Sequence, residues 1–338
     1  MSPFPAERVR SWPKAELHVH LEGTVDASTL LELARRHGIE PPARDEAGID
    51  AWYHFRDFDQ FLERYFFVIS LLKNPDDFAL VAERYLGTAH AQGVRHVEFH
   101  VSATGHILES GHRWVDIQEG IVVGCERAEA RFGVSSLLIP DISPHLPASE
   151  CARAMDEVLA DRHPSVVAIG MGGPADHWWT DDFSPIYRAA AAEGLRLVAH
   201  AGEHGPAREV AFAIEEFGAE RIQHGIGATG DAEVVAMLVE RGIACDVCPG
   251  SNLALGAVRT PGEHPLSEMI DAGITVTLGS DDPPMFQTSL LDEYRRAWEW
   301  CDLDEAGLRE LAANSLAASF APRHRVESWC RELEGRVD

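Results

Sequence analysis

The stretch Lys14-Ala15-Glu16-Leu17-His18-Val19-His20-Leu21-Glu22-Gly23 places two histidines one residue apart inside an apolar run. Because successive side chains of a strand point to opposite faces, His18 and His20 share one face and the aliphatic side chains beside them share the other. Two imidazoles on one face can converge on a metal ion, and histidine is the commonest protein metal ligand. The alternative is a half-buried strand whose histidines are only hydrogen-bonded. The two interpretations differ in whether later strands supply further ligands.

Behind this strand, apolar runs alternate with segments of helical periodicity. Further strands are predicted at 94–102, 134–142, 165–173, 195–203, 221–227, 244–252 and 275–282. Helices are predicted at 27–37, 54–70, 76–92, 114–132, 149–159, 185–193, 206–217, 232–241 and 265–272, and over much of 287–338. Eight apolar strands separated by helices are typical of a closed parallel barrel covered on its outside. The predicted fold class is α/β, a (β/α)8 TIM barrel with extra helices after the first strand and at the C-terminus.

The domain organisation follows from length and from the absence of internal boundaries. A TIM barrel typically takes ~250 residues and tolerates insertions, so 338 residues suit one barrel. No repeat, low-complexity tract or linker divides the sequence, and we expect a single domain over 1–338. The segment 42–92 is an insertion rich in aromatic residues. Its aromatic side chains either belong to the core or form a helical lid over a flat ligand.

Composition excludes several classes of partner. Acidic residues outnumber basic ones 55 to 29, giving a formal net charge of −26, and such a surface repels nucleic acid and anionic lipid. Residues 1–12 carry charges and prolines where a signal peptide is apolar, and no run reaches the ~18 apolar residues of a membrane span. We therefore expect a cytoplasmic protein with a small-molecule substrate, no nucleic acid and no membrane, and its oligomeric state is left open.

The cysteines fit the same expectation. Six cysteines in a long chain without a secretion signal indicate reduced thiols. Cys245 and Cys248 form a single C-x-x-C in an apolar stretch with no second pair. A zinc or redox role for these two thiols is the minor interpretation.

Polar residues recur where three later strands end. The fifth strand ends in His200-Ala201-Gly202-Glu203, the sixth contains His224, and the eighth ends in Gly279-Ser280-Asp281-Asp282-Pro283. The C-terminal face of the strands is where barrel enzymes build their active sites. Singly, these residues could be helix caps, turns or satisfied core histidines. Together they would cost several kcal/mol to bury unless they are paired or bind metal. The sequence therefore predicts a metal site at the barrel mouth.

The ligand set and its chemistry follow from residue types. Three imidazoles and one carboxylate suit zinc, with iron or manganese less favoured; the set is His18, His20, His200 and Asp281. A bound ion lowers the pKa of a coordinated water toward ~7 and makes a hydroxide nucleophile. His224 and Asp281 can orient and deprotonate this water. Glu203, without a metal role, is free to act as a general acid toward the substrate.

These residues lead to a resemblance. The stretch Pro13 to Gly23, His200-Ala201-Gly202-Glu203, His224-Gly225 and Ser280-Asp281-Asp282-Pro283 resemble the adenosine and adenine deaminase family of the amidohydrolase superfamily. The stretch Asn314-Ser315-Leu316-Ala317-Ala318-Ser319-Phe320 is similar to the last barrel-packing helix of that family. The resemblance covers residues 13 to about 322, with four motifs in the family's order and spacing.

The resemblance implies a TIM-barrel hydrolase with one zinc per chain that adds water to C6 of a 6-aminopurine and releases ammonia. It assigns the zinc ligands as His18, His20, His200 and Asp281. It assigns Glu203 to protonate a ring nitrogen and His224 to orient the hydroxide. Asp282 would accept a hydrogen bond from the purine, and the Gly173 N–H would meet another ring nitrogen.

The substrate expected from this resemblance is adenosine or 2′-deoxyadenosine, converted to inosine or 2′-deoxyinosine. The alternatives are free adenine, converted to hypoxanthine, and a 5′-substituted nucleoside such as aminodeoxyfutalosine. Glu22 stands where adenosine deaminases usually have Asp and free-adenine deaminases often have Glu. It can accept a hydrogen bond from a sugar hydroxyl or fill the sugar space beside N9. Residues 23–34 hold no Arg or Lys for a terminal carboxylate.

Two other departures concern the third and fourth strands. The fourth strand reads Gly170-Met171-Gly172-Gly173-Pro174 and lacks the acidic residues common there. The third ends Pro140-Asp141-Ile142-Ser143 without the arginine of many adenosine-specific members.

Two rival functions are weighed against deamination. A binuclear amidohydrolase bridges its metals with a modified lysine on the fourth strand, but the only lysines are Lys14 and Lys73. A non-enzymatic binding protein would have no need of Glu203, His224 and Asp282 beyond the metal ligands. Both rivals are therefore less favoured than a deaminase.

Overall fold

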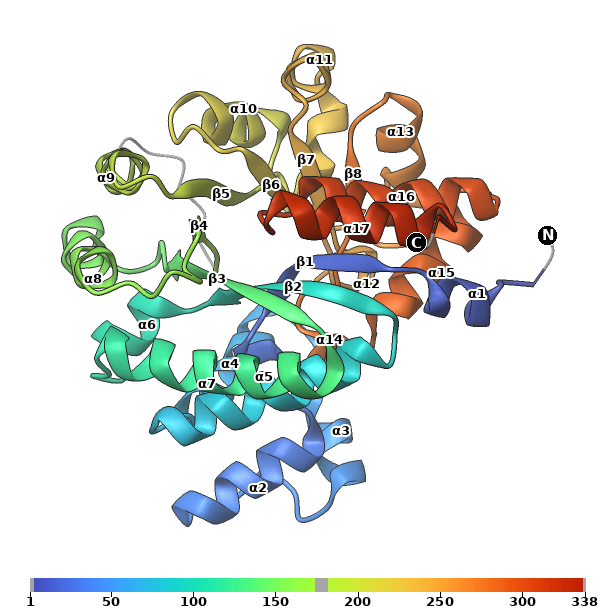
Figure 1. Cartoon of the computed structure of the whole chain (residues 1–338). Coiled ribbons are helices and arrows are strands. Elements are labelled where there is room, and N and C mark those ends of the chain that lie inside the picture. The colour runs from blue at the N-terminus through green and yellow to red at the C-terminus, as the bar shows by residue number, and fades with distance from the viewer. Residues whose placement is uncertain (1–2, 174–181, 337–338) are drawn as a thin grey trace.

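The structure, a computed structural model, describes residues 3–173 and 182–336. Its strands form one eight-stranded parallel sheet in which each strand pairs with the next in sequence. The strands are β1 (Lys14–His20), β2 (Val94–Val101), β3 (Ser135–Ile142), β4 (Ala168–Met171), β5 (Arg196–Ala201), β6 (Arg221–His224), β7 (Ala244–Val247) and β8 (Val276–Leu278). Helices surround these strands in Figure 1. The predicted (β/α)8 TIM barrel is confirmed.

The barrel closes between β1 and β8 through the backbone of the predicted metal ligands. The Asp281 N–H donates to the His18 carbonyl at 3.1 Å, and the His20 N–H donates to the Asp281 carbonyl at 3.0 Å. Beneath these bonds, the buried Glu16 carboxylate accepts from the Ser280 N–H at 3.2 Å and from its hydroxyl at 2.6 Å. The same hydrogen bonds therefore close the barrel and position the predicted ligands.

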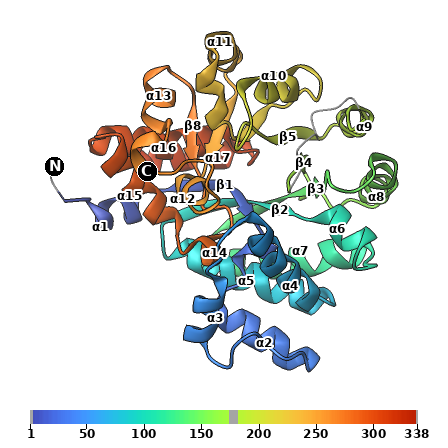
Figure 2. The ribbon, with the colours of Figure 1, turned by 180° about the vertical axis from the view of Figure 1, so that it is seen from behind.

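Helices cover the outside of the barrel. They are α1 (Ala6–Ser11), α2 (Ala27–His37), α3 (Glu46–Tyr53), α4 (Phe58–Leu71), α5 (Pro75–His90), α6 (Ala103–Leu108), α7 (Trp114–Phe132), α8 (Ala148–Ala160), α9 (Ser184–Ala192), α10 (Ala207–Glu215), α11 (Ala232–Arg241), α12 (Pro249–Ala254), α13 (Leu266–Asp271), α14 (Pro283–Phe286), α15 (Leu290–Trp300), α16 (Glu305–Ala318) and α17 (Arg323–Leu333). In both views α5 and α7 lie on the opposite side of the strands from α10, α11 and α13 (Figure 1, Figure 2). Within the described residues, no helix is long and apolar enough to cross a membrane.

The extra helices are confirmed after β1 and at the C-terminus. In the inserted segment, α4 begins where Asp57 caps the Gln60 N–H at 2.9 Å, and α5 begins with Pro75 in its first turn. At the C-terminus, α16 lies across the closing strands. The Ser315 hydroxyl accepts from the Ala15 N–H at 3.0 Å, and the Asn314 amide donates to the Val276 carbonyl at 3.1 Å.

Several predicted strands are too long at their C-terminal ends. The predicted strand 244–252 ends at Val247, and Pro249 starts the short helix α12 instead. The predicted strands 221–227 and 275–282 end at His224 and Leu278. His224 and Asp281 have φ values of 62°, a left-handed conformation that no strand continues through. Short helices α1, α3, α6 and α12 are not predicted, because they are too brief for a helical apolar period to show.

The floor of the barrel holds a buried ion-pair network. The Arg221 guanidinium lies 2.7 Å from the Glu98 carboxylate and 2.6 Å from that of Asp246, and all three side chains are 1% exposed or less. The Asp246 carboxylate also accepts from the Thr277 hydroxyl at 2.6 Å. Two carboxylates thus share one cation away from water.

We expect Arg221→Met to lower the free energy of unfolding by about 3–5 kcal/mol, because removing one partner leaves buried charge uncompensated. Denaturant titration of the purified protein measures the change. The matched control is Arg196→Met on the neighbouring strand, whose exposed pair with Glu220 should contribute no more than about 1 kcal/mol. Equal effects of the two substitutions would contradict a buried, mutually dependent network.

Candidate active site and metal centre

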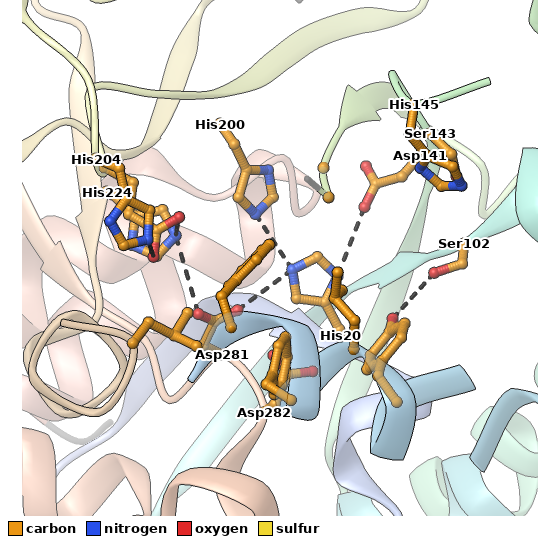
Figure 3. A pocket seen from close by; sticks show the side chains of 18 of the residues that line it. His20, Ser102, Asp141, Ser143, His145, His200, His204, His224, Asp281 and Asp282 are labelled. Atoms are coloured by element: carbon orange, nitrogen blue, oxygen red, sulfur yellow. Dashed lines mark hydrogen bonds and ion pairs between the residues drawn. The ribbon is translucent and has the colours of Figure 1, made fainter. Parts of the chain in front are cut away.

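Four predicted ligand atoms converge at the C-terminal ends of β1, β5 and β8. The Nε2 atom of His200 lies 3.1 Å from that of His18 and 3.2 Å from that of His20. The Asp281 Oδ1 atom lies 3.4 Å from the His18 Nε2 and 3.3 Å from the His20 Nε2. His200, His20 and Asp281 point toward one another in Figure 3. These four residues form a group able to hold a metal ion.

The hydrogen bonds of the other ring nitrogens show that this cluster fits a cation. The Nδ1 of His18 lies 2.9 Å from the Asp246 carbonyl, and the Nδ1 of His200 lies 2.7 Å from the Met171 carbonyl. A carbonyl only accepts, so both Nδ1 atoms carry hydrogen, and Nε2 is the ring nitrogen left to bind a cation. Tetrahedral ligand atoms ~2.0–2.2 Å from zinc lie about 3.3–3.6 Å apart. The observed spacings are close to that geometry.

His20 has a different partner, which sequence reasoning missed. Its Nδ1 lies 3.7 Å from the Asp141 Oδ2, and the Asp141 carboxylate also meets the His100 Nδ1 at 3.0 Å. A Cβ on Gly170 of β4 would lie 2.0 Å from the Asp141 Oδ1. Gly170 of β4 has no side chain, and the Asp141 carboxylate of β3 occupies the space that a side chain would need. The signal was present in the sequence as an Asp at the end of β3 opposite a glycine.

Two site residues adopt a strained backbone. His224 and Asp281 have φ values of 62°, a conformation that costs non-glycine residues about 1–2 kcal/mol. His224 is the last residue of β6, whereas Gly279 and Ser280 separate Asp281 from the end of β8. Both side chains line the cavity. The Ser251 hydroxyl of α12 donates to the Asp281 Oδ2 at 2.6 Å. Neither Ser251 nor its helix was predicted as part of the site.

The surroundings of Glu203 are those that favour a protonated carboxyl. Its Oε2 lies 3.6 Å from the His224 Nε2, and its Oε1 is buried without a hydrogen-bond partner among the described residues. Burial, reinforced by the Asp281 charge, raises the pKa of Glu203 to about 8. The carboxyl therefore holds its proton near neutral pH and can deliver it.

Asp282 and Gly173 both face the cavity. Asp282 is 3% exposed, and its Oδ1 has no hydrogen-bond partner within the described residues. Burial and the neighbouring Asp281 charge raise the pKa of Asp282 well above its ordinary value. A Cβ on Gly23 would lie 1.7 Å from the Asp282 Oδ1, so Gly23 leaves the room that this side chain occupies. Gly173 lines the cavity with a φ of 114°, which favours glycine.

A cavity of about 710 Å³ joins these groups to an aromatic wall. It is lined by His20, His200, Glu203, His224, Asp281 and Asp282 on the barrel side. On the other side it is lined by aromatic residues of α4, namely Phe58, Phe61, Tyr65 and Phe66. The core interpretation of the inserted segment holds for Tyr53, Phe61 and Phe78, and Phe61 also lines the cavity. Phe58 and Tyr65 pack against this core from the cavity wall.

Glu22 lies outside this cavity. It is 0% exposed, and its Oε1 accepts from the Ser102 N–H at 3.0 Å and from the His106 Nε2 at 2.9 Å. Its Oε2 accepts from the Tyr65 hydroxyl at 3.2 Å. Tyr65 and Ser102 line the cavity and Glu22 does not. Two of the residues that bond the carboxylate, Tyr65 and Ser102, therefore lie between it and the cavity.

The C-x-x-C cysteines remain separate thiols. Cys245 and Cys248 are both free and buried. The Cys248 Sγ lies 3.3 Å from the His18 Nδ1, so this thiol packs behind the ligand cluster. It contributes no atom to the four-ligand group described above.

Comparison with known proteins identifies the family. The family model described as adenosine deaminase matches residues 13–334. An adenine deaminase of Rhodospirillum rubrum is 35% identical over 94% of this chain and 95% of its own. An aminodeoxyfutalosine deaminase of Streptomyces avermitilis is 38% identical over 91% of this chain and 86% of its own.

Solved structures agree with these relatives. The crystal structure of an adenine deaminase from Arthrobacter aurescens has a TM-score of 0.91 at 34% identity, covering 96% of this chain and 98% of that one. An amidohydrolase structure with bound Zn from Burkhoderia ambifaria has a TM-score of 0.87 at 29% identity, covering 99% and 95%. The chain therefore belongs to the adenosine deaminase family and is a hydrolase that acts on carbon–nitrogen bonds.

Proposed function

We propose that this enzyme converts free adenine to hypoxanthine and ammonia, using one zinc ion held by His18, His20, His200 and Asp281. The relatives compared above are named for adenine or aminodeoxyfutalosine. Adenosine, the substrate expected from the sequence, is therefore replaced here by the alternative that the sequence left open. The preference for a nucleoside relied on Glu22 as a partner for the sugar.

The observation that carries this proposal is the position of Glu22. A ribose needs polar partners for its hydroxyls, and the one acidic candidate beside the ligand strand is buried. Its carboxylate is already engaged by a backbone N–H, an imidazole and a phenol. Tyr65 lies between it and the cavity. A free base makes no demand on such a group, whereas a nucleoside would need other partners for its sugar hydroxyls in place of Glu22.

Charge in the cavity also favours an uncharged substrate. Among the cavity-lining residues within 3–173 and 182–336, none is Arg or Lys, and the sequence of 174–181 contains neither. Seven Asp and Glu residues line the same cavity: Asp59, Glu109, Asp141, Glu203, Glu209, Asp281 and Asp282. A phosphate or carboxylate on the substrate would meet repulsion rather than an ion pair.

A 5′-substituted adenosine is the second candidate. The cavity volume of about 710 Å³ falls in the range of sites that take drug-sized ligands, ~300–1,000 Å³. One relative named for aminodeoxyfutalosine is 38% identical. The cavity volume and the sequence similarity favour this candidate. The absence of Arg and Lys among the described cavity-lining residues opposes it, because a terminal carboxylate would find no cation there.

The proposed chemistry assigns one task to each side chain. When bound, the metal lowers the pKa of a water molecule so that it attacks at neutral pH. Glu203 gives its proton to a ring nitrogen, which makes C6 electrophilic. Asp282 and the Gly173 N–H orient the ring from its edge. Asp281 and His224 border the attacking water, and the amino group leaves as ammonia.

The substrate proposal predicts that adenine is turned over with a kcat/KM at least a hundredfold above that of adenosine or 2′-deoxyadenosine. The sugar gains no partner in Glu22, whose carboxylate is already engaged by Ser102, His106 and Tyr65. Ammonia release measured side by side on adenine, adenosine, 2′-deoxyadenosine and aminodeoxyfutalosine tests it. A kcat/KM for any nucleoside equal to that for adenine would rule out the free base as the preferred substrate, and the deaminase family would stand.

We expect Glu203→Gln to lower kcat by about 10² to 10⁴-fold, because an amide cannot deliver the proton that activates the ring. Metal content should be unchanged, since Glu203 is not a ligand. The control is Glu109→Gln, a half-exposed carboxylate on the cavity wall, whose kcat should change less than about twofold. Near-normal turnover of Glu203→Gln with full metal content would assign the proton to another group.

The metal proposal predicts one zinc equivalent per chain by elemental analysis. Removing it with a chelator should abolish activity and lower the melting temperature, because four ligand groups lose the cation that stabilises them. Restoring one equivalent of zinc should recover both. Two equivalents, both required for activity, would overturn the mononuclear assignment.

A further inference from the structure

A chain of hydrogen bonds runs from a backbone amide on α13 to the active-site ring of His224. It starts at the Leu266 N–H, which lies 3.1 Å from the His264 Nδ1. A backbone N–H can only donate, so this Nδ1 carries no hydrogen. Burial lowers the pKa of His264 to about 4, so the ring is neutral and its hydrogen sits on Nε2.

The second bond fixes the side-chain amide of Asn252. The His264 Nε2 lies 3.2 Å from the Asn252 Oδ1, and the N–H there donates to the amide oxygen. The amide NH₂ is thereby turned the other way, and the Asn252 Nδ2 lies 3.1 Å from the His224 Nδ1. An amide NH₂ only donates, so the His224 Nδ1 accepts. The Leu266 N–H therefore decides which atom donates and which accepts in each later hydrogen bond of the chain.

Burial leaves these groups few other partners. Asn252 is 0% exposed, His224 1% and His264 8%. Asn252 belongs to α12, which begins at Pro249. The backbone carbonyl of Asn252 accepts from the Val258 N–H at 3.1 Å. The side chains are thus held between two short helices, where water cannot easily replace a bond.

We propose that His264 and Asn252 are positioning residues that hold His224 as the tautomer with hydrogen on Nε2, so that His224 is a hydrogen-bond donor in the site and not its base. The Nε2–H faces the Glu203 Oε2 at 3.6 Å. It also faces the Asp281 Oδ2 at 3.9 Å, and Figure 3 shows His224 beside Asp281. A nitrogen that already carries hydrogen cannot take a proton from water.

The inference rests on the proposed deamination for its kinetic consequence, but the tautomer can be observed without turnover. Nitrogen-15 NMR of the zinc-loaded enzyme labelled at histidine distinguishes a protonated from an unprotonated ring nitrogen. Subtracting the spectrum of His224→Gln assigns the His224 signals. We expect a protonated Nε2 and an unprotonated Nδ1. A protonated Nδ1 in the wild-type enzyme would overturn the proposal whatever the substrate proves to be.

Two substitutions of His264 test the role of the chain in kinetics. Gln at 264 has an oxygen to accept from the Leu266 N–H and an NH₂ to donate to Asn252, so the direction of the bonds is kept. Leu at 264 removes the donor and lets the Asn252 amide turn over. We expect His264→Gln to stay within about fivefold of the wild-type kcat, and His264→Leu to lose about 10² to 10³-fold in kcat with KM changed less than threefold.

Asn252→Asp reverses the direction of the hydrogen bond to the His224 Nδ1, because a carboxylate can only accept and would accept from both rings. The His224 signals should then show hydrogen on Nδ1, with a kcat loss of 10² to 10⁴-fold, comparable to the cost of a wrong tautomer in serine proteases. Metal content and circular dichroism of all variants exclude loss of the site or of the fold. Unchanged kcat in both His264→Leu and Asn252→Asp, with normal folding, would contradict the proposal.

Discussion

Two backbone hydrogen bonds of Asp281, one to His18 and one from His20, close the barrel and set the distances within the ligand cluster. The remaining neighbours in the sheet pair along a ladder, whereas β1 and β8 meet mainly at this point. The closure holds only because Asp281 takes a left-handed backbone conformation. A substitution that straightened this turn would open the barrel and separate the metal ligands together. Asp281 therefore bears both on the closure of the barrel and on the geometry of the group able to hold a metal ion.

The same coupling extends downward into the barrel floor. Arg221 holds the carboxylates of Glu98 and Asp246 in the apolar interior, and the carbonyl of Asp246 receives the Nδ1–H of His18. The buried ion pairs therefore fix the backbone that orients a ligand ring. Buried charge of this kind contributes little net stability compared with apolar packing. Its value here is that it positions the ligand ring in the site above.

Two acidic groups of the site share surroundings that raise their pKa values. Glu203 and Asp282 are buried beside the Asp281 charge, and the pKa values of both are raised. Glu203 can thus give a proton at a pH where an exposed carboxyl has none to give. His224 is directed differently, by a line of donors that begins at a backbone amide. The cavity thus places a carboxyl of raised pKa beside the group able to hold a metal ion, and within 3–173 and 182–336 its lining contains no Arg or Lys.

The sequence by itself determined the barrel, its order of strands and helices, and the four residues that converge at its mouth, because these depend on local periodicity and on strand ends that a parallel barrel must bring together. His18 and His20 share a face in any strand, and Asp281 follows an apolar run in any register. Only the tertiary structure decided what fills the space around them. Asp141 occupies the volume that Gly170 leaves on the next strand, and Asn252 and His264 meet across two short helices that carry no periodic signal. Glu22 shows the same limit: its residue type suggested a sugar contact, but three partners from distant segments draw its carboxylate behind Tyr65. Which groups a side chain contacts across the fold depends on packing between elements far apart in the chain, and local sequence patterns do not encode it.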